Sequence, residues 1–282
     1  MRSGPESGGW AKRLQRCLYD KEGDAMSQIL GLKTGSTYGP VDSRRLGRSL
    51  GINILPRDAK LCSLDCVYCQ YGWTKVHELR PRPGSGLPAP RDVRSALEEK
   101  LRSLSALPDY ITFSGNGEPT LHPDFETMVG EATAVRDRLA PAAKTAVLSN
   151  STTAGDPAVR AALLRLDVRI MKLDAGTAPI FARYSRPCPG VDLETVTRGL
   201  EALSSAAPVI VQALFTNGKN GNLGAAEVEA WRARLVRIRP EMVQIYTLAR
   251  GYPDKDIAPA TLEDLRGVKA MLDPAGVSSR IF

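Results

Sequence analysis

The sequence predicts an α/β fold built around a parallel β-sheet, and three observations support this prediction. From about residue 49, short apolar runs of the kind found in buried strands alternate with longer amphipathic stretches. Six such runs occur, and helix-type stretches separate them as in βαβ units. No segment divides the series in two. We therefore expect one domain over residues 26–282, either an open doubly wound sheet or a partial barrel.

The expected strands are runs rich in Val, Ile, Leu and aromatic residues. They span residues 49–54, 110–115, 144–150, 168–174, 209–215 and 242–248, and the last six residues, VSSRIF, are a candidate for one more short strand. Because ligands of parallel α/β folds gather where the strands end, polar motifs at the carboxyl ends of these runs are candidates for a functional site.

The expected helices carry apolar residues at helical spacing. They span residues 91–107, 122–140, 158–166, 192–203, 225–239 and 261–272. Pro123 falls near the first turn of the second helix, where proline is favoured. The last helix opens with Thr261 three residues before Asp264, a Thr-x-x-acid capping signal.

The first 25 residues differ from the rest of the chain, because they begin with a Gly/Ser-rich stretch and contain no expected strand. We expect them to form a poorly ordered extension, and Met26 is an alternative start. The sequence shows neither a secretory signal nor a bilayer-spanning apolar run, so we expect a cytoplasmic protein. The net charge of +7 permits an anionic partner, such as a phosphorylated metabolite or RNA.

Three cysteines follow the first expected strand: Cys62, Cys66 and Cys69, spaced C-x3-C-x2-C. Three buried but inert cysteines are one interpretation. Structural zinc is a second, but zinc normally takes four ligands, and the remaining candidates are isolated in the sequence: Cys17, Cys188, His77 and His122. The third is an iron–sulfur cluster held by three thiolates, which leaves one iron open, as a catalytic metal site requires.

The cysteine spacing, with Tyr68 directly before the last cysteine, resembles the radical S-adenosylmethionine (SAM) superfamily. The resemblance implies a partial (β/α)6-type TIM barrel with parallel strands, and one [4Fe–4S] cluster bound by Cys62, Cys66 and Cys69. It also implies that SAM, bound at the open iron, is cleaved reductively to a 5′-deoxyadenosyl radical that abstracts hydrogen from a substrate. An external electron donor such as flavodoxin or ferredoxin is a further expected partner.

Motifs at the following strand ends extend the resemblance to the residues expected to bind SAM. Gly115, Asn116, Gly117 and Glu118 resemble the family's Gly-Gly-Glu motif, which holds the SAM amino group, although asparagine replaces the second glycine. Glycines allow close backbone approach, and a carboxylate accepts charge-assisted hydrogen bonds from an ammonium group.

The third and fourth strand ends supply further candidate SAM contacts. Ser149 and Asn150 match a family position that contacts the SAM ribose or carboxylate, and an Asx-type turn is the structural alternative. Tyr68 corresponds to an aromatic residue that lies against the adenine. Asp174 is a candidate for the ribose hydroxyls or the substrate, and an inward ion pair with Lys172 is the alternative.

The stretches YGPVDSRRLGRSLGINILP (38–56), SGNGEPTLHP and YSRPCPG resemble a group of radical SAM Fe–S oxidoreductases related to the wyosine-forming transfer RNA enzymes. Cys188, in the last of these stretches, is a candidate hydrogen-atom donor in a redox-neutral reaction such as epimerisation, or a small loop residue. The candidates for the substrate side are Arg44, Arg45, Lys172, Gln212, Tyr246 and Arg250.

The sequence therefore predicts an oxidoreductase- or lyase-type radical SAM enzyme acting on a small molecule or peptide. RNA base modification is the main alternative, and a zinc-stabilised binding protein without catalytic activity is a distant one. A second cluster is not expected, because only Cys17 and Cys188 remain to bind it. No membrane partner is expected.

Overall fold

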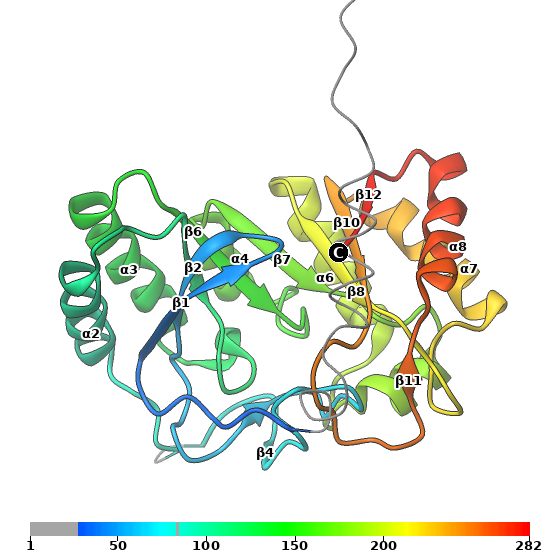
Figure 1. Cartoon of the computed structure of the whole chain (residues 1–282), viewed down its shortest axis with the longest axis horizontal. Helices are drawn as coiled ribbons and strands as arrows, with labels where there is room; N and C mark the ends of the chain where they lie inside the picture. Colours follow the sequence, from blue (N-terminus) through cyan, green and yellow to red (C-terminus); the bar gives the residue numbers. More distant parts are fainter. Residues whose placement is uncertain (1–27, 83–84) are drawn as a thin grey trace, which may run out of the picture.

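The computed structural model describes residues 28–82 and 85–282, and its core is an eight-stranded sheet with the strand order β1-β2-β5-β6-β7-β8-β10-β12 (Figure 1). The strands are β1 (Thr37–Ser43), β2 (Gly47–Ile52), β5 (Tyr110–Phe113), β6 (Lys144–Ser149), β7 (Val168–Lys172), β8 (Ile210–Leu214), β10 (Met242–Tyr246) and β12 (Ser279–Ile281). All neighbouring strands pair in parallel except β1 and β2, which form an antiparallel hairpin.

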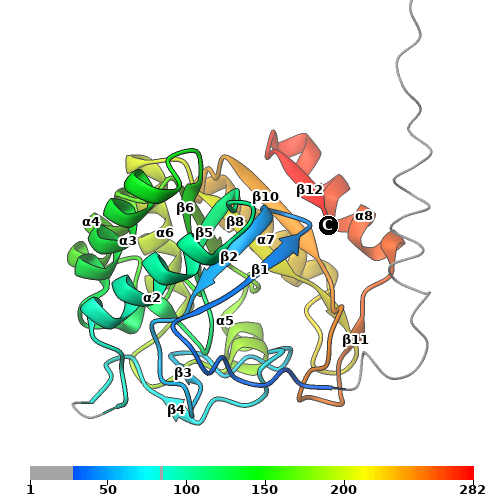
Figure 2. The same ribbon diagram turned by 60° about the vertical axis from the view of Figure 1, so that its left-hand side comes forward.

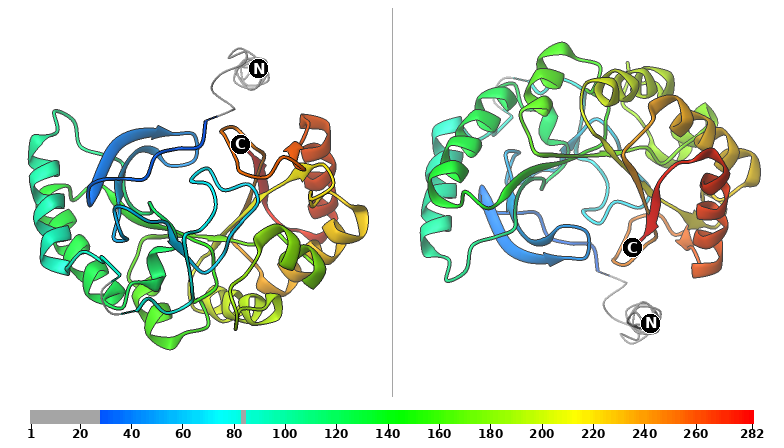
Figure 3. Two further views of the ribbon diagram at one scale, coloured as in Figure 1. Left: turned by 90° about the horizontal axis from the view of Figure 1, so that it is seen from below. Right: turned by 90° about the horizontal axis from the view of Figure 1, so that it is seen from above.

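Helices cover the outer side of the curved sheet, and the sheet does not close (Figure 3). They are α2 (Pro90–Ser103), α3 (Phe125–Leu139), α4 (Pro157–Leu164), α6 (Leu193–Ala206), α7 (Ala225–Ile238) and α8 (Leu262–Leu272). The β1–β2 hairpin and β12 form the two edges. The architecture is therefore the predicted partial barrel in a single domain, and all six expected strands and six expected helices are present.

Shorter elements connect this frame. They are β3 (Leu61–Cys62), β4 (Val76–His77), β9 (Thr216–Asn217), β11 (Ala258–Pro259), η1 (Pro119–Leu121), α5 (Ala178–Ile180), η2 (Phe181–Ser185) and η3 (Asp273–Ala275). Figure 2 shows that β3 and β4, which belong to the segment with the three cysteines, lie at one end of the sheet. The prediction of an N-terminal extension, together with Cys17, falls outside the described residues.

The helices are held to the sheet by apolar side chains at helical spacing. In α2 the buried residues are Val93, Leu97 and Leu101, four apart. In α7, Trp231 packs edge-on against Phe215 with 5.0 Å between ring centroids, and its indole nitrogen donates to the Leu173 carbonyl at 2.8 Å. The apolar core therefore lies between the helices and the outer face of the sheet. The inner face is left to line the site.

One edge strand of the sheet was predicted from the sequence and the other was not. The final segment does form a strand, β12, parallel to β10. Strand β1 was not expected, because it contains Pro40 and the exposed residues Val41 and Asp42. Proline is tolerated at a sheet edge, where one side of the strand needs no hydrogen-bond partner, so the alternating pattern of a buried strand is absent.

No helix within the described ranges has the length and apolar character of a membrane span.

Candidate active site

A cavity of about 470 Å³ lies inside the curve of the sheet. One part is lined by the cysteine segment and by residues that follow β5 and β6, and another by the turn between β1 and β2. The cavity brings together most of the residues singled out in the sequence: Arg44, Arg45, Cys62, Cys66, Tyr68, Cys69, Gly115, Gly117, Glu118, Ser149, Asn150, Lys172, Gln212, Tyr246 and Arg250. Asn116, Asp174 and Cys188 do not line it.

The segment with the three cysteines is tied down by its own hydrogen bonds. The Cys69 amide donates to the Cys66 carbonyl at 3.1 Å. The Asp65 carboxylate accepts from the Thr74 amide at 2.6 Å and lies 3.4 Å from the Arg186 guanidinium. All three cysteines are free, Cys62 is buried, and the other two are half-buried. The loop therefore holds three thiols at the cavity wall without a disulfide.

The glycine turn after β5 is bonded directly to the strand that carries Cys62. The Leu61 amide donates to the Asn116 carbonyl at 3.0 Å, and the Glu118 amide donates to the Leu61 carbonyl at 3.0 Å. Gly117 has a φ of +136°, and a Cβ built there would lie 1.7 Å from the Leu61 oxygen. Only glycine allows this approach. Gly115 has a similar φ, and a Cβ built there would lie 2.4 Å from the Asn53 side-chain oxygen.

Glu118 is a buried carboxylate at the cavity wall. Its Oε2 accepts from the Asn150 amide at 2.5 Å, and its Oε1 accepts from the Thr120 amide and hydroxyl at 3.1 and 2.6 Å. Burial raises its pKa, and these hydrogen bonds partly oppose that shift. The Ser149 hydroxyl bonds it as well, so protein donors fix the orientation of the Glu118 carboxylate at the cavity wall.

The Asn150 side chain points toward the cysteine segment. Its Nδ2 donates to the Ser63 hydroxyl at 2.9 Å and lies 3.4 Å from the Cys62 sulfur. Its Oδ1 accepts from the Thr152 amide at 3.1 Å, so the Asx-type turn that was the structural alternative is present. Ser149 is buried beside it and accepts from the Ser151 amide at 3.1 Å. Lining the cavity and stabilising the turn are compatible roles for Asn150.

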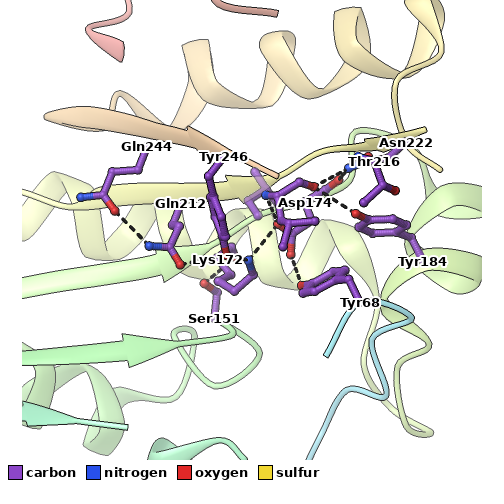
Figure 4. Close-up of polar contacts among 12 residues, drawn as sticks. Tyr68, Ser151, Lys172, Asp174, Tyr184, Gln212, Thr216, Asn222, Gln244 and Tyr246 are labelled. Atoms are coloured by element: carbon purple, nitrogen blue, oxygen red, sulfur yellow. Dashed lines mark hydrogen bonds and ion pairs between the residues drawn. The ribbon is translucent and has the colours of Figure 1, made fainter. Parts of the chain in front are cut away.

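A network of polar side chains runs across β7, β8 and β10 on the inner side of the sheet (Figure 4). Lys172 Nζ lies 3.1 Å from Asp174 Oδ1 and donates to the Tyr246 hydroxyl at 2.7 Å. Tyr246 donates to Gln212 Oε1 at 3.2 Å, and Gln212 donates to Gln244 at 2.9 Å. Burial lowers the pKa of Lys172, but Asp174 and Tyr246 outweigh it and raise the pKa overall. Lys172 is therefore a half-buried ammonium group.

Asp174 is surrounded by protein donors rather than by the cavity. Besides Lys172, it accepts from the Leu214 amide at 2.7 Å and from the Tyr68 hydroxyl. The inward ion pair that the sequence left as an alternative is thus present. Tyr68 lines the cavity, packs on Tyr184 with 5.0 Å between centroids, and is oriented by this hydrogen bond.

Two further candidates point away from the cavity. Asn116 is fully buried, and its side chain exchanges hydrogen bonds with the backbone of Lys33, accepting at 2.7 Å and donating at 2.9 Å. It therefore anchors the segment that precedes β1. Cys188 is buried, and its amide donates to the Ser63 carbonyl at 2.9 Å. This placement does not support hydrogen-atom donation by Cys188 into the cavity and fits the alternative of a small loop residue.

Sequence reasoning missed several cavity residues on the segments around β1 and the first cysteine. Lys60 is buried and donates to the Gly72 carbonyl at 2.7 Å. The Tyr38 hydroxyl lies 2.6 Å from Ser114, and Lys33 Nζ is 4.9 Å from the Tyr38 ring centroid. Lys60 lies two positions before Cys62, and Tyr38 opens the family-like stretch, so position in the sequence was the available signal.

Comparison with known proteins assigns the family. The sequence model of the Radical SAM superfamily matches residues 59–222, more than half of the chain. The chain therefore belongs to the radical SAM superfamily. It is 36% identical over 166 residues to a UPF0026 protein of Methanocaldococcus jannaschii, covering 58% of this chain and 48% of that protein. It is 29% identical over 229 residues to a UPF0026 protein of Helicobacter pylori, covering 80% and 70%.

A protein named GTPase Obg from Brachyspira hyodysenteriae is 33% identical over 169 residues, which cover 60% of this chain and 23% of that protein. The matches thus span less than half the length of two of these three relatives.

Solved structures show the same fold at low sequence identity. A radical SAM methyltransferase from Sphaerobacter thermophilus has a TM-score of 0.57 and 12% identity, and the match covers 83% of this chain and 65% of that one. SuiB of Streptococcus suis bound to S-adenosylmethionine has a TM-score of 0.58 and 12% identity, covering 82% and 50%. TYW1 with a lysine-pyruvate adduct bound has a TM-score of 0.55 and 14% identity, covering 94% and 81%.

Membership of this superfamily means that the protein uses a [4Fe–4S] cluster and SAM, and it decides against the zinc-stabilised binding protein. No three described side chains gather as tightly as one metal ion would require. A four-iron cluster differs, because each thiolate binds a different iron and the sulfurs stand further apart. Burial raises the pKa of Cys66 to about 12 and also raises that of Cys62. These shifts favour the protonated thiols, and a metal that binds a thiol displaces its proton. Three free thiols that line one cavity therefore fit the cluster as donors.

Replacement of Gly117 by alanine tests the contact between the cysteine strand and the glycine turn. We expect Gly117→Ala to destabilise the protein by about 3 kcal/mol or more, because a Cβ there meets the Leu61 carbonyl. Gly267→Ala is the control: it lies in α8 with no atom within 4 Å of an added Cβ, and it should be neutral or stabilising by about 1 kcal/mol. Chemical denaturation measures both, and equal stabilities of the two variants would contradict the proposed constraint.

The cysteine inventory predicts one cluster per chain. Beyond Cys62, Cys66 and Cys69, the sequence offers Cys17 and Cys188, too few for a second cluster. Iron and acid-labile sulfide analysis of the anaerobically reconstituted protein should give about four of each per chain. A ratio near eight would show that an auxiliary cluster exists.

Proposed function

We propose that the protein reductively cleaves SAM at one [4Fe–4S] cluster and abstracts a hydrogen atom from a small-molecule or peptide substrate. The observation that carries this proposal is one cavity lined by three free cysteines, a glycine turn with a carboxylate, and polar side chains from the inner face of the sheet. When bound, the cluster and SAM supply a 5′-deoxyadenosyl radical, after reduction by an external donor such as flavodoxin or ferredoxin.

The residues on the cysteine side bind and orient these groups. Cys62, Cys66 and Cys69 hold the cluster. Glu118, which its hydrogen bonds hold at the cavity wall, receives the ammonium group of SAM, and Asn150 contributes polar contacts between Glu118 and the cysteine segment. Ser149 and the backbone of Gly115 and Gly117 complete this wall, and Tyr68 provides an aromatic face for the adenine.

The remaining wall binds the substrate. Lys172, Gln212 and Tyr246 come from three adjacent strands and are fixed by their mutual hydrogen bonds. Because the network is preorganised, these groups can orient a substrate without losing much side-chain entropy. A cavity of about 470 Å³ is in the lower half of the range for small-ligand sites, so it suits SAM together with a small substrate or the end of a peptide.

The central test is product formation by the reduced holoenzyme. Incubated anaerobically with SAM and dithionite, the reconstituted wild type should release 5′-deoxyadenosine, detected by liquid chromatography and mass spectrometry. Cys66→Ala should bind less iron and lose at least 99% of this activity, since one cluster thiolate is absent. Cys188→Ala is the matched control and should retain iron and activity, because its thiol is outside the cavity lining. Absence of 5′-deoxyadenosine from fully loaded wild type would refute the proposal.

Modification of transfer RNA is a second candidate. It is supported by the fold shared with TYW1, the net charge of +7, and the exposed Arg44 at the cavity. If RNA is the substrate, the affinity for transfer RNA should fall steeply as the salt concentration rises. A plot of log affinity against log salt concentration should be linear. Filter binding at several salt concentrations measures this, with Arg44→Gln expected to reduce the slope by about one unit. Binding too weak to detect even at low salt would leave the small-molecule or peptide proposal.

A further inference from the structure

We propose that the substrate carries an anionic group, a carboxylate or a phosphate, that binds at Arg45 and Arg250, with Arg44 beside them. This inference rests on the proposed function, because it concerns the substrate part of the same cavity. It begins from the distribution of charge along the lining. The cationic residues of the lining are Lys33, Arg44, Arg45, Lys60, Lys172 and Arg250, and the acidic ones are Asp42 and Glu118.

Two of these cations already face groups of the protein that can balance their charge. Lys172 is neutralised by its ion pair with Asp174. Lys60 lies beside the cysteine segment, where its ammonium faces the thiols that hold the cluster. The cations that remain are Lys33, Arg44, Arg45 and Arg250. Arg44 and Arg45 lie at the turn between β1 and β2, and Arg250 follows β10. Of these, Arg45 is closest to the polar network, because its guanidinium lies 4.6 Å from the ring centroid of Tyr246.

Arg45 is placed by the hairpin at the open side of the sheet. It lies in the turn between β1 and β2, and its amide donates to the Ser43 hydroxyl at 3.3 Å. The cysteines follow the opposite end of β2, which at about 3.3 Å per residue is roughly 17–20 Å long. The turn and the cysteine segment therefore line different parts of the cavity. SAM at the cysteines leaves the turn available to another ligand.

Among the described residues, no carboxylate forms an ion pair with Arg44, Arg45 or Arg250. Within residues 28–82 and 85–282, the charged groups that act on Arg45 are Arg44, Arg250 and the Tyr246 hydroxyl. Burial lowers the pKa of Arg45, Tyr246 raises it, and the two neighbouring arginines lower it further. Arg250 donates to the neutral amide of Gln70 at 2.9 Å. Pairing with core acids, the structural alternative to anion binding for Arg44 and Arg45, is therefore not found among the described residues.

Arg45 is half-buried and feels the charges of the exposed Arg44 and Arg250. This repulsion is unfavourable, and an anion bound among the three groups would relieve it. Guanidinium groups bind carboxylates and phosphates through two parallel hydrogen bonds, which fixes orientation as well as position. Stacking on Tyr246 holds the Arg45 guanidinium plane in place and leaves its edge available for such bonds. Because Tyr246 also bonds Lys172, an anion at Arg45 places the rest of the substrate against the polar network.

The test measures anion binding to holoenzyme that is already saturated with SAM, so that the carboxylate of SAM cannot account for the result. Isothermal titration calorimetry under anaerobic conditions uses inorganic phosphate in one arm and succinate in the other. We expect at least one of them to bind wild type. Phosphate alone indicates a phosphorylated substrate, succinate alone indicates a carboxylate, and binding of both supports the shared anion site.

The variants Arg45→Gln and Arg250→Gln should weaken binding about tenfold or more, because each removes a charge-assisted contact. Arg198→Gln is the matched control: it removes a charge from an exposed position on α6 and should leave the affinity unchanged. Iron content and melting temperature are measured for every variant, and Arg45→Lys, which keeps the charge, replaces Arg45→Gln if the latter does not fold.

The proposal is overturned if neither anion binds the SAM-saturated wild type, or if Arg45→Gln and Arg250→Gln bind as tightly as Arg198→Gln. These outcomes are separate from those of the proposed function. Titration of an anion needs no reductant and no turnover, whereas 5′-deoxyadenosine formation needs both. A wild type that forms 5′-deoxyadenosine but binds no anion would retain the proposed function and lose only the anionic substrate.

Discussion

The backbone contact between Leu61 and Gly117 is the constraint on which the site depends. Leu61 precedes Cys62, and Gly117 precedes Glu118. The two hydrogen bonds at this contact therefore hold Cys62 close to Glu118, the carboxylate that we propose binds SAM. The approach is too close for any side chain at Gly117. Groups that are more than 50 positions apart in the sequence thus face one cavity through a rigid backbone contact, so neither depends on a flexible loop for its position.

The buried Asp174 carboxylate plays the corresponding part on the other wall. It neutralises Lys172, orients Tyr68, and accepts from the backbone of β8. A buried ammonium group without such a partner would carry a large desolvation cost. With the charge of Lys172 satisfied, the arginines that remain for a substrate are Arg44 and Arg45 at the β1–β2 turn and Arg250 after β10. The two ends of the cavity therefore differ in chemistry: thiols and a carboxylate at one, arginines at the other.

Much of this arrangement could be predicted because parallel strands are buried on both faces and read as apolar runs, and because their carboxyl ends converge. Glu118, Asn150, Lys172 and Tyr246 were found by that rule and line one cavity. Strand β1 escaped it, because an edge strand with Pro40 needs neither an apolar run nor a full set of hydrogen bonds.

The sequence alone determined the class of the protein and where six of its strands lie along the chain, since the cysteine spacing and the apolar periodicity are local properties of the chain. Only the tertiary structure decided where individual side chains point. Asn116 turns to Lys33, and Arg45 reaches Tyr246 across the open side of the sheet. Each of these directions depends on a partner distant in sequence, so no local pattern could encode it.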